Sequence, residues 1–242
     1  TDGTSNYIKD VINSRSRYVW FAGFGTASKF DADAGTTAIS GRDYKLASPA
    51  AVDISLVSGA NSAALTTTEY ATGFDQFEDV DNIQVDFLIA PGMVARADQT
   101  TVVNDLVSIA QSTRKDCVVI ASPSRSDVVT GNDINNDVIT TAKTFTYSSY
   151  LFIDNNYLKV YDKYNDQYIN IPAASSTAGF MASSGNDQAA WYSPAGQRRG
   201  AYLGVTSLAY TPTKSQRDLL YRNGINPIAN LPGQGILLYG DK

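Results

Sequence analysis

The sequence predicts a layered α/β domain, of mixed α+β content, that carries a β-meander and follows part of a loop-rich β domain. Two apolar strands, at residues 83–90 and 117–122, flank a helix at 100–114 whose apolar side chains recur at three- and four-residue spacing. Strand, helix and strand in this order, with nearly continuous apolar strands, are typical of a parallel sheet inside an α/β layer.

A change in composition at residue 73 predicts the second part of this description. Residues 1–72 contain an aromatic strand at 18–22 and a strand at 51–57, set within long stretches of Gly, Ala, Ser, Thr and Asp that are typical of loops. The regular patterns begin at residue 73. We therefore expect a partial, loop-rich β domain at 1–72 and the α/β domain at 73–242.

The remaining elements of the second domain follow from local signals. Asn and Asp mark turns, Thr and Pro mark helix starts, and Gly marks helix ends. The expected elements are a helix at 127–144, a hairpin of 150–153 with 157–161 turning at Asp154-Asn155-Asn156, a turn at Asn165-Asp166 before a strand at 168–171, a helical segment at 201–210, a helix opened by Thr211-Pro212 and closed by Gly224, and a last strand at 236–239.

The composition is that of a folded chain with an acidic balance. Of 242 residues, 43% are hydrophobic and 18% are charged, which supports a sizeable core. The formal net charge is −5, and an acidic chain repels phosphate backbones and anionic lipids. No apolar stretch of the sequence approaches the ~20 residues that span a bilayer. We therefore expect no nucleic acid and no membrane as a direct partner.

The chain contains no histidine, which narrows the chemistry open to it. Ser-His-Asp and Cys-His catalysis, His-ligated zinc and the usual proton shuttle near neutral pH are all excluded. The single cysteine, Cys117, lies in an apolar run, where a cysteine usually packs as a small core residue. We expect no catalytic residues, and any chemistry would rest on carboxylates, Lys, Tyr or Ser.

Three local patterns resemble ligand sites but fail in detail. Gly23–Ser28 resembles a dinucleotide-binding loop, yet Ser28 replaces the third glycine and no good helix follows. Asp31–Gly35 begins like a calcium loop, but Arg42 stands where a bidentate Glu is needed. The acidic residues between 75 and 81 could bind a hard cation, although a solvated turn explains them better. We expect no cofactor and no metal.

Seven groups of residues, read in order through 73–242, resemble the myophage contractile tail sheath protein family. The order of the segments makes the resemblance specific, since each segment alone is weak. The segments are Gly73–Asp79 with Leu88–Gly92, Arg114–Val119, Tyr161–Asp166, Trp191–Gly196 with Arg199-Gly200, Arg217–Tyr221, Gly224–Pro227, and Gly233–Gly235 through Tyr239–Lys242.

This resemblance implies a structural role and no enzymatic activity. It implies a subunit that joins other sheath subunits in a helical homo-oligomeric array around the tail tube protein, and that contracts to drive the tube through the host envelope. Baseplate and tail terminator proteins would be further partners, the location would be the virion tail, and assembly would occur in the host cytoplasm. Family members also have an N-terminal arm and a C-terminal domain outside the matched segments, so we expect a soluble fragment that does not assemble by itself.

The same resemblance supplies candidate residues for shaping the domain or its contacts. They fall in the segment around 191–200 and in the loop at 226–235, where turn and cap roles for Gly and Pro are an equally good explanation. The candidates are Trp191, Pro194, Ala195, Gly196, Arg199, Gly200, Asn226, Pro227, Gly233 and Gly235.

Three alternatives stay open from the sequence. The first is the sheath of a phage-derived contractile device, such as a bacteriocin or a secretion apparatus. The second is an α/β enzyme that uses carboxylates or Lys, which a deep pocket at the carboxyl edge of the sheet would favour. The third is a receptor- or carbohydrate-binding module, because fifteen tyrosines could serve as exposed anchors or as filler on sheet faces.

Overall fold

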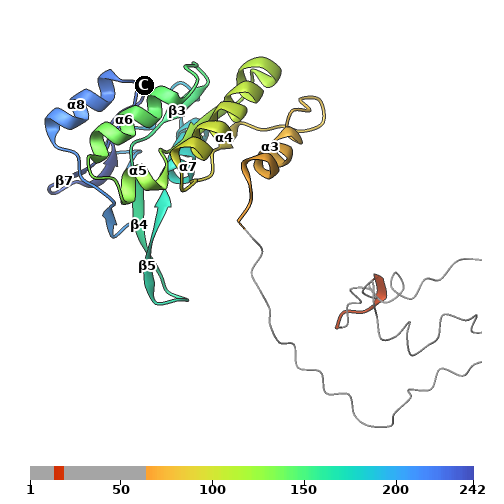
Figure 1. Cartoon of the computed structure of the whole chain (residues 1–242), viewed down its shortest axis with the longest axis horizontal. Helices are drawn as coiled ribbons and strands as arrows, with labels where there is room; N and C mark the ends of the chain where they lie inside the picture. Colours follow the sequence, from red (N-terminus) through yellow and green to blue (C-terminus); the bar gives the residue numbers. More distant parts are fainter. Residues whose placement is uncertain (1–13, 19–63) are drawn as a thin grey trace, which may run out of the picture. The chain divides into compact units, whose positions relative to one another are not determined.

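A computed structural model describes residues 14–18 and 64–242 of the chain (Figure 1). The chain divides into two compact units, Thr1–Ser62 and Ala63–Lys242. The strand expected at 51–57, the Gly23–Ser28 and Asp31–Gly35 patterns and all but the first residue of the 18–22 strand lie outside the described residues.

Helices and short strands alternate through this unit, as the sequence predicts for an α/β fold. The helices of the second unit are α3 (Thr67–Asp75), α4 (Arg96–Ser108), the π-helix η1 (Ile109–Arg114), α5 (Arg125–Val129), α6 (Ile134–Thr144), α7 (Ala174–Asp187) and α8 (Lys214–Arg222). The strands are β1 (Phe87–Ile89), β2 (Val118–Ala121), β3 (Leu151–Ile153), β4 (Tyr157–Asp162), β5 (Gln167–Pro172), β6 (Ser207–Leu208), β7 (Ile228–Leu231) and β8 (Gly235–Leu238).

The central layer is a parallel sheet in the order β1-β2-β3. Side chains of successive strand residues point to opposite faces, so Val119 and Ala121 join the cluster that contains the apolar side of α4, whereas Ile120 joins the cluster that contains α7. Helix α4 therefore covers one face and α7 the other. The predicted three-part α/β arrangement is confirmed, although β1 is much shorter than the expected strand at 83–90.

The helix expected at 100–114 is present but longer. It begins at Arg96 as α4 and continues as the π-helix η1, which ends at Lys115 in a left-handed conformation with φ of 62°. The Lys115 N–H donates to the Ala110 carbonyl at 2.8 Å, which closes the last, wider turn. The sequence did not predict residues 96–99 as part of the helix, because Ala95 at the N-cap position has no side chain that caps the helix.

The helix expected at 127–144 is two helices, α5 and α6, which break at Gly131. A Cβ at Gly131 would lie 2.6 Å from the Asp127 carbonyl oxygen, so only glycine fits there. Asp133 then caps α6 by accepting a hydrogen bond from the Asn136 N–H. The break is thus a close backbone approach followed by a new N-cap.

The hairpin expected at 150–161 is wrong. Strand β3 pairs in parallel with β2, and β4 belongs to a different sheet, in the order β5-β4-β6. Asp154, Asn155 and Asn156, which were expected to form the turn of that hairpin, are completely buried. The true hairpin is β4–β5, which confirms the turn expected at Asn165-Asp166; Asp166 has a positive φ of 50° there.

In the C-terminal part, one further predicted element is wrong and two are present. Residues 201–210 are extended, with β6 and a bridge between Ala201 and Leu237, and are not helical. The next helix, α8, is capped by Thr213 and not by Thr211, because Thr213 and Gln216 form a reciprocal capping box. Gly224 follows the end of α8 with φ of 79°, as expected.

Three apolar clusters make up the core of the second unit. One lies between α4 and the parallel sheet, one between that sheet, α7 and the β-strands of the C-terminal half, and one among α5, α6 and α8. Cys117 is buried in the first cluster, as expected. The predicted domain boundary at residue 73 falls inside α3, which is continuous from Thr67 to Asp75. Across the described residues, none of the helices has the length and apolar character that crossing a membrane requires.

Candidate functional site

The carboxyl edge of the parallel sheet is occupied by buried polar side chains. Ser122 follows β2 and Asp154 follows β3, and both are completely buried. The Ser122 hydroxyl donates to Asp154 Oδ2 at 2.9 Å and accepts from the Ala174 N–H at the start of α7 at 3.0 Å. Asp154 Oδ1 accepts from the Asn156 N–H at 3.2 Å. The cluster thereby connects two strands with the first turn of a helix.

The environment of Asp154 favours its neutral form. Burial raises the pKa of Asp154 to about 8, and the hydrogen bonds from Asn156 and Ser122 offset only part of that effect. A carboxyl group with so high a pKa is mostly protonated near neutral pH. Perturbed carboxyl groups are also common in active sites, so the surroundings of Asp154 decide what it does.

Those surroundings are filled with protein. Asn155 Nδ2 donates to the Tyr210 hydroxyl at 2.9 Å, and Asn155 Oδ1 accepts from the Ile228 N–H at 2.7 Å. Asn156 Nδ2 donates to the Tyr210 carbonyl oxygen at 2.8 Å. Ligands of open α/β sheets bind in a crevice outside the carboxyl ends of the strands, whereas here the asparagines and the β7 segment occupy that position. These side chains therefore hydrogen-bond to other protein groups and connect the sheets.

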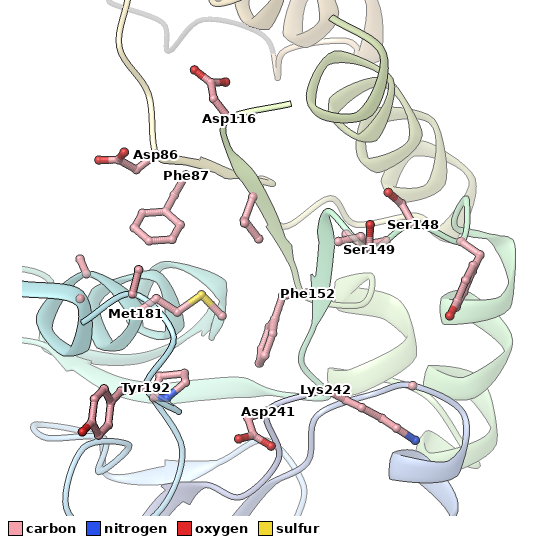
Figure 2. Close-up of a pocket in the computed structure, with 18 of the residues that line it drawn as sticks. Asp86, Phe87, Asp116, Ser148, Ser149, Phe152, Met181, Tyr192, Asp241 and Lys242 are labelled. Carbon is pink, nitrogen blue, oxygen red and sulfur yellow. The ribbon is translucent and has the colours of Figure 1, made fainter. Parts of the chain in front are cut away.

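A large cleft lies at the opposite, amino edge of the parallel sheet (Figure 2). Its volume is about 1050 Å³. Its lining includes Asp86 and Phe87 at the start of β1, Asp116 two residues before β2, Phe152 of β3 and Met181 of α7. The aromatic and thioether side chains give it an apolar floor.

Charged side chains stand on the rim of this cleft. Its lining includes the carboxylates of Asp86, Asp116 and Asp241 and two cations, Arg222 and Lys242. Asp116 is already bound by Arg114, whose Nε and Nη2 donate to it at 2.9 and 3.0 Å. The hydrogen bond between Arg114 and Asp116 makes the largest contribution to lowering the pKa of Asp116. The same bond raises the pKa of Arg114. The described residues contain no group of three or more Cys, Asp or Glu side chains that could hold a metal ion.

The Arg114 side chain also fixes the segment that precedes β1. Its Nη1 donates to the Phe77 carbonyl at 2.6 Å, and its Nη2 donates to the Ile83 carbonyl at 2.9 Å. Within this segment Asp79 accepts a hydrogen bond from Asn82 Nδ2 at 2.7 Å. This bond makes the largest contribution to lowering the pKa of Asp79. The acidic stretch at 75–81 is therefore built around an aspartate-capped turn.

The candidates between 191 and 200 form a loop packed on β8. Gly196 has φ of 93°, and its N–H donates to the Leu238 carbonyl at 2.9 Å; the Leu238 N–H donates to the Gly200 carbonyl at 2.8 Å. Arg199 Nε donates to the Ser193 carbonyl at 2.8 Å. Pro194 and Ala195 are partly buried, and Pro194 lines the cleft. Trp191 has 85% of its surface exposed, and Arg199 is exposed as well.

The candidates between 226 and 235 surround the β7–β8 hairpin. Asn226 and Pro227 are buried, and the Asn226 N–H donates to the Ile153 carbonyl at 2.8 Å. Gly233 and Gly235 have φ of 75° and 81° and form the hairpin turn. The two groups of candidates thus meet on opposite sides of β8, and a contact role for them stays a prediction.

Three exposed aromatic side chains lie together on the β4–β5 hairpin. Tyr161, Tyr164 and Tyr168 are 51%, 86% and 55% exposed, whereas Tyr157 at the base of β4 and Tyr202 are buried. The tyrosines therefore divide into core residues and surface residues. The sequence predicts the turn at Asn165-Asp166 but not which tyrosines are exposed around it, nor the cleft, because the same residue type appears in both environments.

An α/β domain with a filled carboxyl edge and aromatic side chains on a projecting hairpin has the surface of an assembly module, a domain that contacts other proteins. Comparison with known proteins agrees, since the family described as phage tail sheath protein central domain matches residues 63–242. The chain belongs to this family. The match begins where the second compact unit begins.

The curated relatives are tail sheath proteins of phages. The chain is 36% identical over 195 residues to that of Enterobacteria phage T4, which covers 75% of this chain and 29% of the relative. It is 33% identical over 201 residues to that of Vibrio phage KVP40, covering 76% and 30%, and 32% identical over 245 residues to that of Salmonella phage ViI, covering 100% and 34%. The chain therefore spans about a third of the length of these relatives.

Solved structures share the fold. The contracted helical sheath of the anti-feeding prophage has a TM-score of 0.53 at 17% identity, with 74% of this chain and 44% of that chain covered. A chain of the anti-feeding prophage baseplate has a TM-score of 0.52 at 16% identity, with 71% and 41% covered. At these identities the similarity concerns the fold alone.

Proposed function

We propose that this chain is part of a structural subunit of a bacteriophage contractile tail sheath. In this role it joins other sheath subunits in a helical array around a tail tube, and the array contracts to drive the tube through the host envelope. The observation that carries the proposal is the family match over 63–242 together with relatives that are all named tail sheath protein.

The proposal includes the absence of catalysis. The structure of the two sheet edges supports the absence of catalysis. The carboxyl edge, where an α/β enzyme would bind its substrate, is closed by Asn155 and Asn156. The cleft lies at the other edge, with exposed carboxylates on its rim. Contraction then draws its free energy from contacts that change between subunits, each worth a few kcal/mol at most and summed over the array.

The partners and location follow from the same proposal. The chain would contact a tail tube protein, a baseplate protein and a tail terminator protein in the virion tail, after assembly in the host cytoplasm. The anti-feeding prophage structures favour a second candidate, the sheath of a phage-derived injection device. Phage relatives at 32–36% identity favour the virion.

Labelling of native particles tests the proposal. Antibodies against the chain are bound to particles purified from the source, which are then imaged by electron microscopy in extended and contracted states. Label distributed along the whole outer layer of the tail, in both states and without added nucleotide, is the expected result. Label confined to the baseplate, or to material without tails, would overturn it. Capsid structural genes next to the coding sequence would separate a phage from a derived device.

A further inference from the structure

The segment that contains α3 and leads into β1 carries only negative charge. Between residues 64 and 95 the sequence has six carboxylates and no Lys or Arg. All six are exposed, and none forms an ion pair within the described ranges. They are Glu69, Asp75, Glu78, Asp79, Asp81 and Asp86. Arg114 donates to carbonyl groups of this segment but is paired with Asp116, so it leaves the six charges uncompensated. Exposed Lys115 offsets at most one of them.

Four of these carboxylates lie on one rigid turn, residues 75–81, which we call the acidic turn. The Ile83 N–H donates to the Asp79 carbonyl at 3.2 Å, and the fully buried Arg114 side chain holds the Phe77 carbonyl. The hydrogen bond from Asn82 lowers the pKa of Asp79, so this carboxylate stays charged. Val80 is 44% exposed between the acidic side chains. The acidic turn is therefore a fixed, charged surface with an apolar residue within it.

The opposite charge predominates on α8. This helix carries three cations, Lys214, Arg217 and Arg222, against one carboxylate, Asp218, and none of the four forms an ion pair in the part of the chain that the structure describes. The neighbouring charges of the last two residues, 241 and 242, cancel each other. We call α8 together with Tyr239 the basic face.

Two exposed tyrosine rings lie among these cations. The Arg217 guanidinium carbon is 5.6 Å from the centre of the Tyr239 ring, and Lys242 Nζ is 4.6 Å from the centre of the Tyr221 ring. Both rings line a hollow of about 120 Å³, together with Pro227. A cavity of about 150 Å³ holds a benzene molecule, so this hollow has room for one small apolar side chain.

The acidic turn and the basic face lie at opposite ends of the second unit. Helix α3 packs on α4, α4 on α6 and α6 on α8, and α3 and α8 stand at the two ends of this row (Figure 1). Like surfaces of two copies repel each other, whereas unlike surfaces attract. Complementary surfaces at separate places on one molecule give a heterologous contact, which extends into an open helical filament when the rotation does not close.

We propose that the acidic turn of one copy docks onto the basic face of the next copy, head to tail. Glu78 and Asp81 approach Lys214 and Arg222, and Val80 packs between the tyrosine rings. The choice of a second copy as partner rests on the proposed sheath function, and the charge distribution of the chain specifies the surfaces. Complementary charge gives a contact its orientation and its rate of formation more than its strength, which suits a contact that is remade during contraction.

An exchange of charge between two variants of the 242-residue chain tests this docking. The turn variant combines Glu78→Lys with Asp81→Lys, and the face variant combines Lys214→Glu with Arg222→Glu. All four side chains are exposed. Each substitution changes the charge by two, so the net charge of −5 becomes −1 in the turn variant and −9 in the face variant. Both variants stay negative, so overall charge does not bring them together.

The matched control changes the same amount of charge outside both surfaces. It combines Asp98→Lys with Asp187→Lys, at exposed aspartates on α4 and α7, and also has a net charge of −1. Association is measured by sedimentation velocity and by the yield of covalent dimer after carbodiimide cross-linking, which joins a carboxylate to an amine in contact with it. Circular dichroism checks that every variant is folded.

Wild type and control should form dimers in equal yield. Each surface variant alone should give about tenfold less, because attraction between the two surfaces becomes repulsion. An equal mixture of the two surface variants should return to the wild-type yield, since each reversed surface then meets an opposite charge. Salt at about 1 M, where the Debye length is about 3 Å, should suppress all of these dimers.

Three results would overturn the docking: no dimer from the wild type, full yield from either surface variant alone, or no recovery in the mixture. Label along contractile tails combined with any of these would leave the sheath function intact and reject this contact alone. Recovery in the mixture combined with label away from tails would reject the sheath function and keep the contact between copies.

Discussion

Asn226 holds Lys242 by a reciprocal pair of hydrogen bonds: its Nδ2 donates to the Lys242 carbonyl at 2.9 Å, and its Oδ1 accepts from the Lys242 N–H at 2.6 Å. The same Nδ2 donates to the Ile153 carbonyl at 3.1 Å. One buried amide therefore attaches the last residues of the chain to the end of β3. Because Asp241 and Lys242 are on the cleft rim, this amide also shapes the cleft.

Replacement of this amide should release the C-terminal segment. We expect Asn226→Ala to lower the free energy of unfolding by about 2 to 3 kcal/mol, because the Ile153 carbonyl keeps only its backbone partner and the Lys242 groups lose theirs. Hydrogen exchange should quicken at residues 239–242 before the rest of the unit is affected. The control is Asn230→Ala, at an exposed asparagine on β7. Equal exchange rates in the two variants would contradict this attachment.

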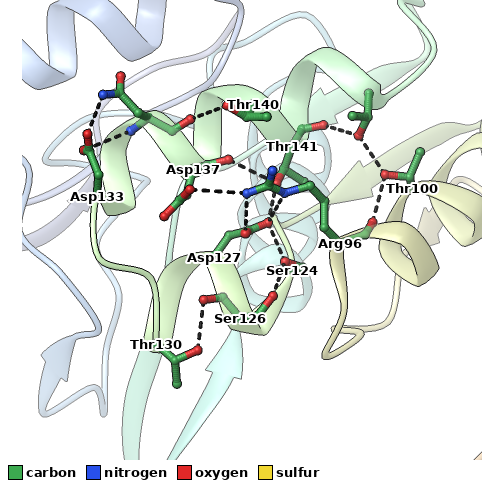
Figure 3. Close-up of polar contacts among 12 residues, drawn as sticks. Arg96, Thr100, Ser124, Ser126, Asp127, Thr130, Asp133, Asp137, Thr140 and Thr141 are labelled. Atoms are coloured by element: carbon green, nitrogen blue, oxygen red, sulfur yellow. Dashed lines mark hydrogen bonds and ion pairs between the residues drawn. The ribbon is translucent and has the colours of Figure 1, made fainter.

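A second prediction concerns the ion pair that joins α4, α5 and α6 (Figure 3). Arg96 Nη2 donates to Asp127 Oδ1 at 2.6 Å and to Asp137 Oδ1 at 3.3 Å, and Asp127 Oδ2 accepts from Ser124 at 2.5 Å and from Thr141. Burial alone would raise the pKa of Asp127, but the hydrogen bonds from Arg96, Ser124 and Thr141 outweigh it and lower the pKa below its usual value.

Arg96→Met should therefore destabilise the domain by about 1 to 2 kcal/mol at neutral pH, with allowance for the partial exposure of Arg96. A carboxyl group with a lowered folded-state pKa stabilises above its unfolded pKa of about 4 and loses this effect as the pH falls through the folded value. The difference between wild type and variant, measured as urea midpoints from pH 7 to pH 3, should shrink towards acid. A constant difference would show that Asp127 does not carry the effect.

The elements that the sequence predicts well are those with local signals. The apolar side of α4 is predicted by the spacing of Val102, Val103, Leu106 and Val107. Strand β2 is predicted by the unbroken apolar run at 118–121. Helix α7 was not predicted, because its Ala, Ser, Thr and Gly residues give little periodic contrast. Packing against the sheet, through Ala174 and Ala178, favours this helix instead.

The wrong hairpin at 150–161 has a different reason. Asp154-Asn155-Asn156 has the composition of a turn, and isolated sequence reasoning assigns it to solvent. Its burial depends on partners far along the chain, such as Tyr210, Asn226 and Ile228, which no local pattern reveals. The cleft and the hairpin surface were missed for the same reason, since exposure is a property of the assembled fold.

Two glycines should respond in opposite directions to alanine. A Cβ at Gly200 would lie 2.9 Å from the Pro194 carbonyl oxygen and 3.1 Å from Leu238 Cβ, so Gly200→Ala must displace the 191–200 loop from β8. We expect a loss of about 1 to 3 kcal/mol. Gly179 lies exposed within α7 with open space around it, so Gly179→Ala should gain about 0.5 to 1 kcal/mol. Thermal unfolding measures both, and an unchanged or raised stability of Gly200→Ala would contradict the close approach at Gly200.

The last prediction concerns the pH dependence that Asp154 confers. Its folded-state pKa of about 8 lies above the unfolded value of about 4, so the native state holds a proton that the unfolded chain has released between these values. The stabilisation is complete below pH 4 and is lost as the pH rises, by about 1.4 kcal/mol per pH unit, until the folded-state pKa is passed.

Asp154→Asn keeps the shape of the side chain and removes the titration. Its amide oxygen can accept from the Asn156 N–H, and its amide nitrogen can donate to the Ser122 hydroxyl, which can turn to accept. We therefore expect a folded variant whose urea midpoint falls less steeply between pH 5 and pH 8 than that of the wild type, and which is the more stable of the two at pH 8. Asp218→Asn, at an exposed aspartate on α8, should follow the wild-type curve. Parallel curves for Asp154→Asn and the wild type would mean that Asp154 is ionised within the fold, with a partner other than Ser122 and Asn156 compensating its charge.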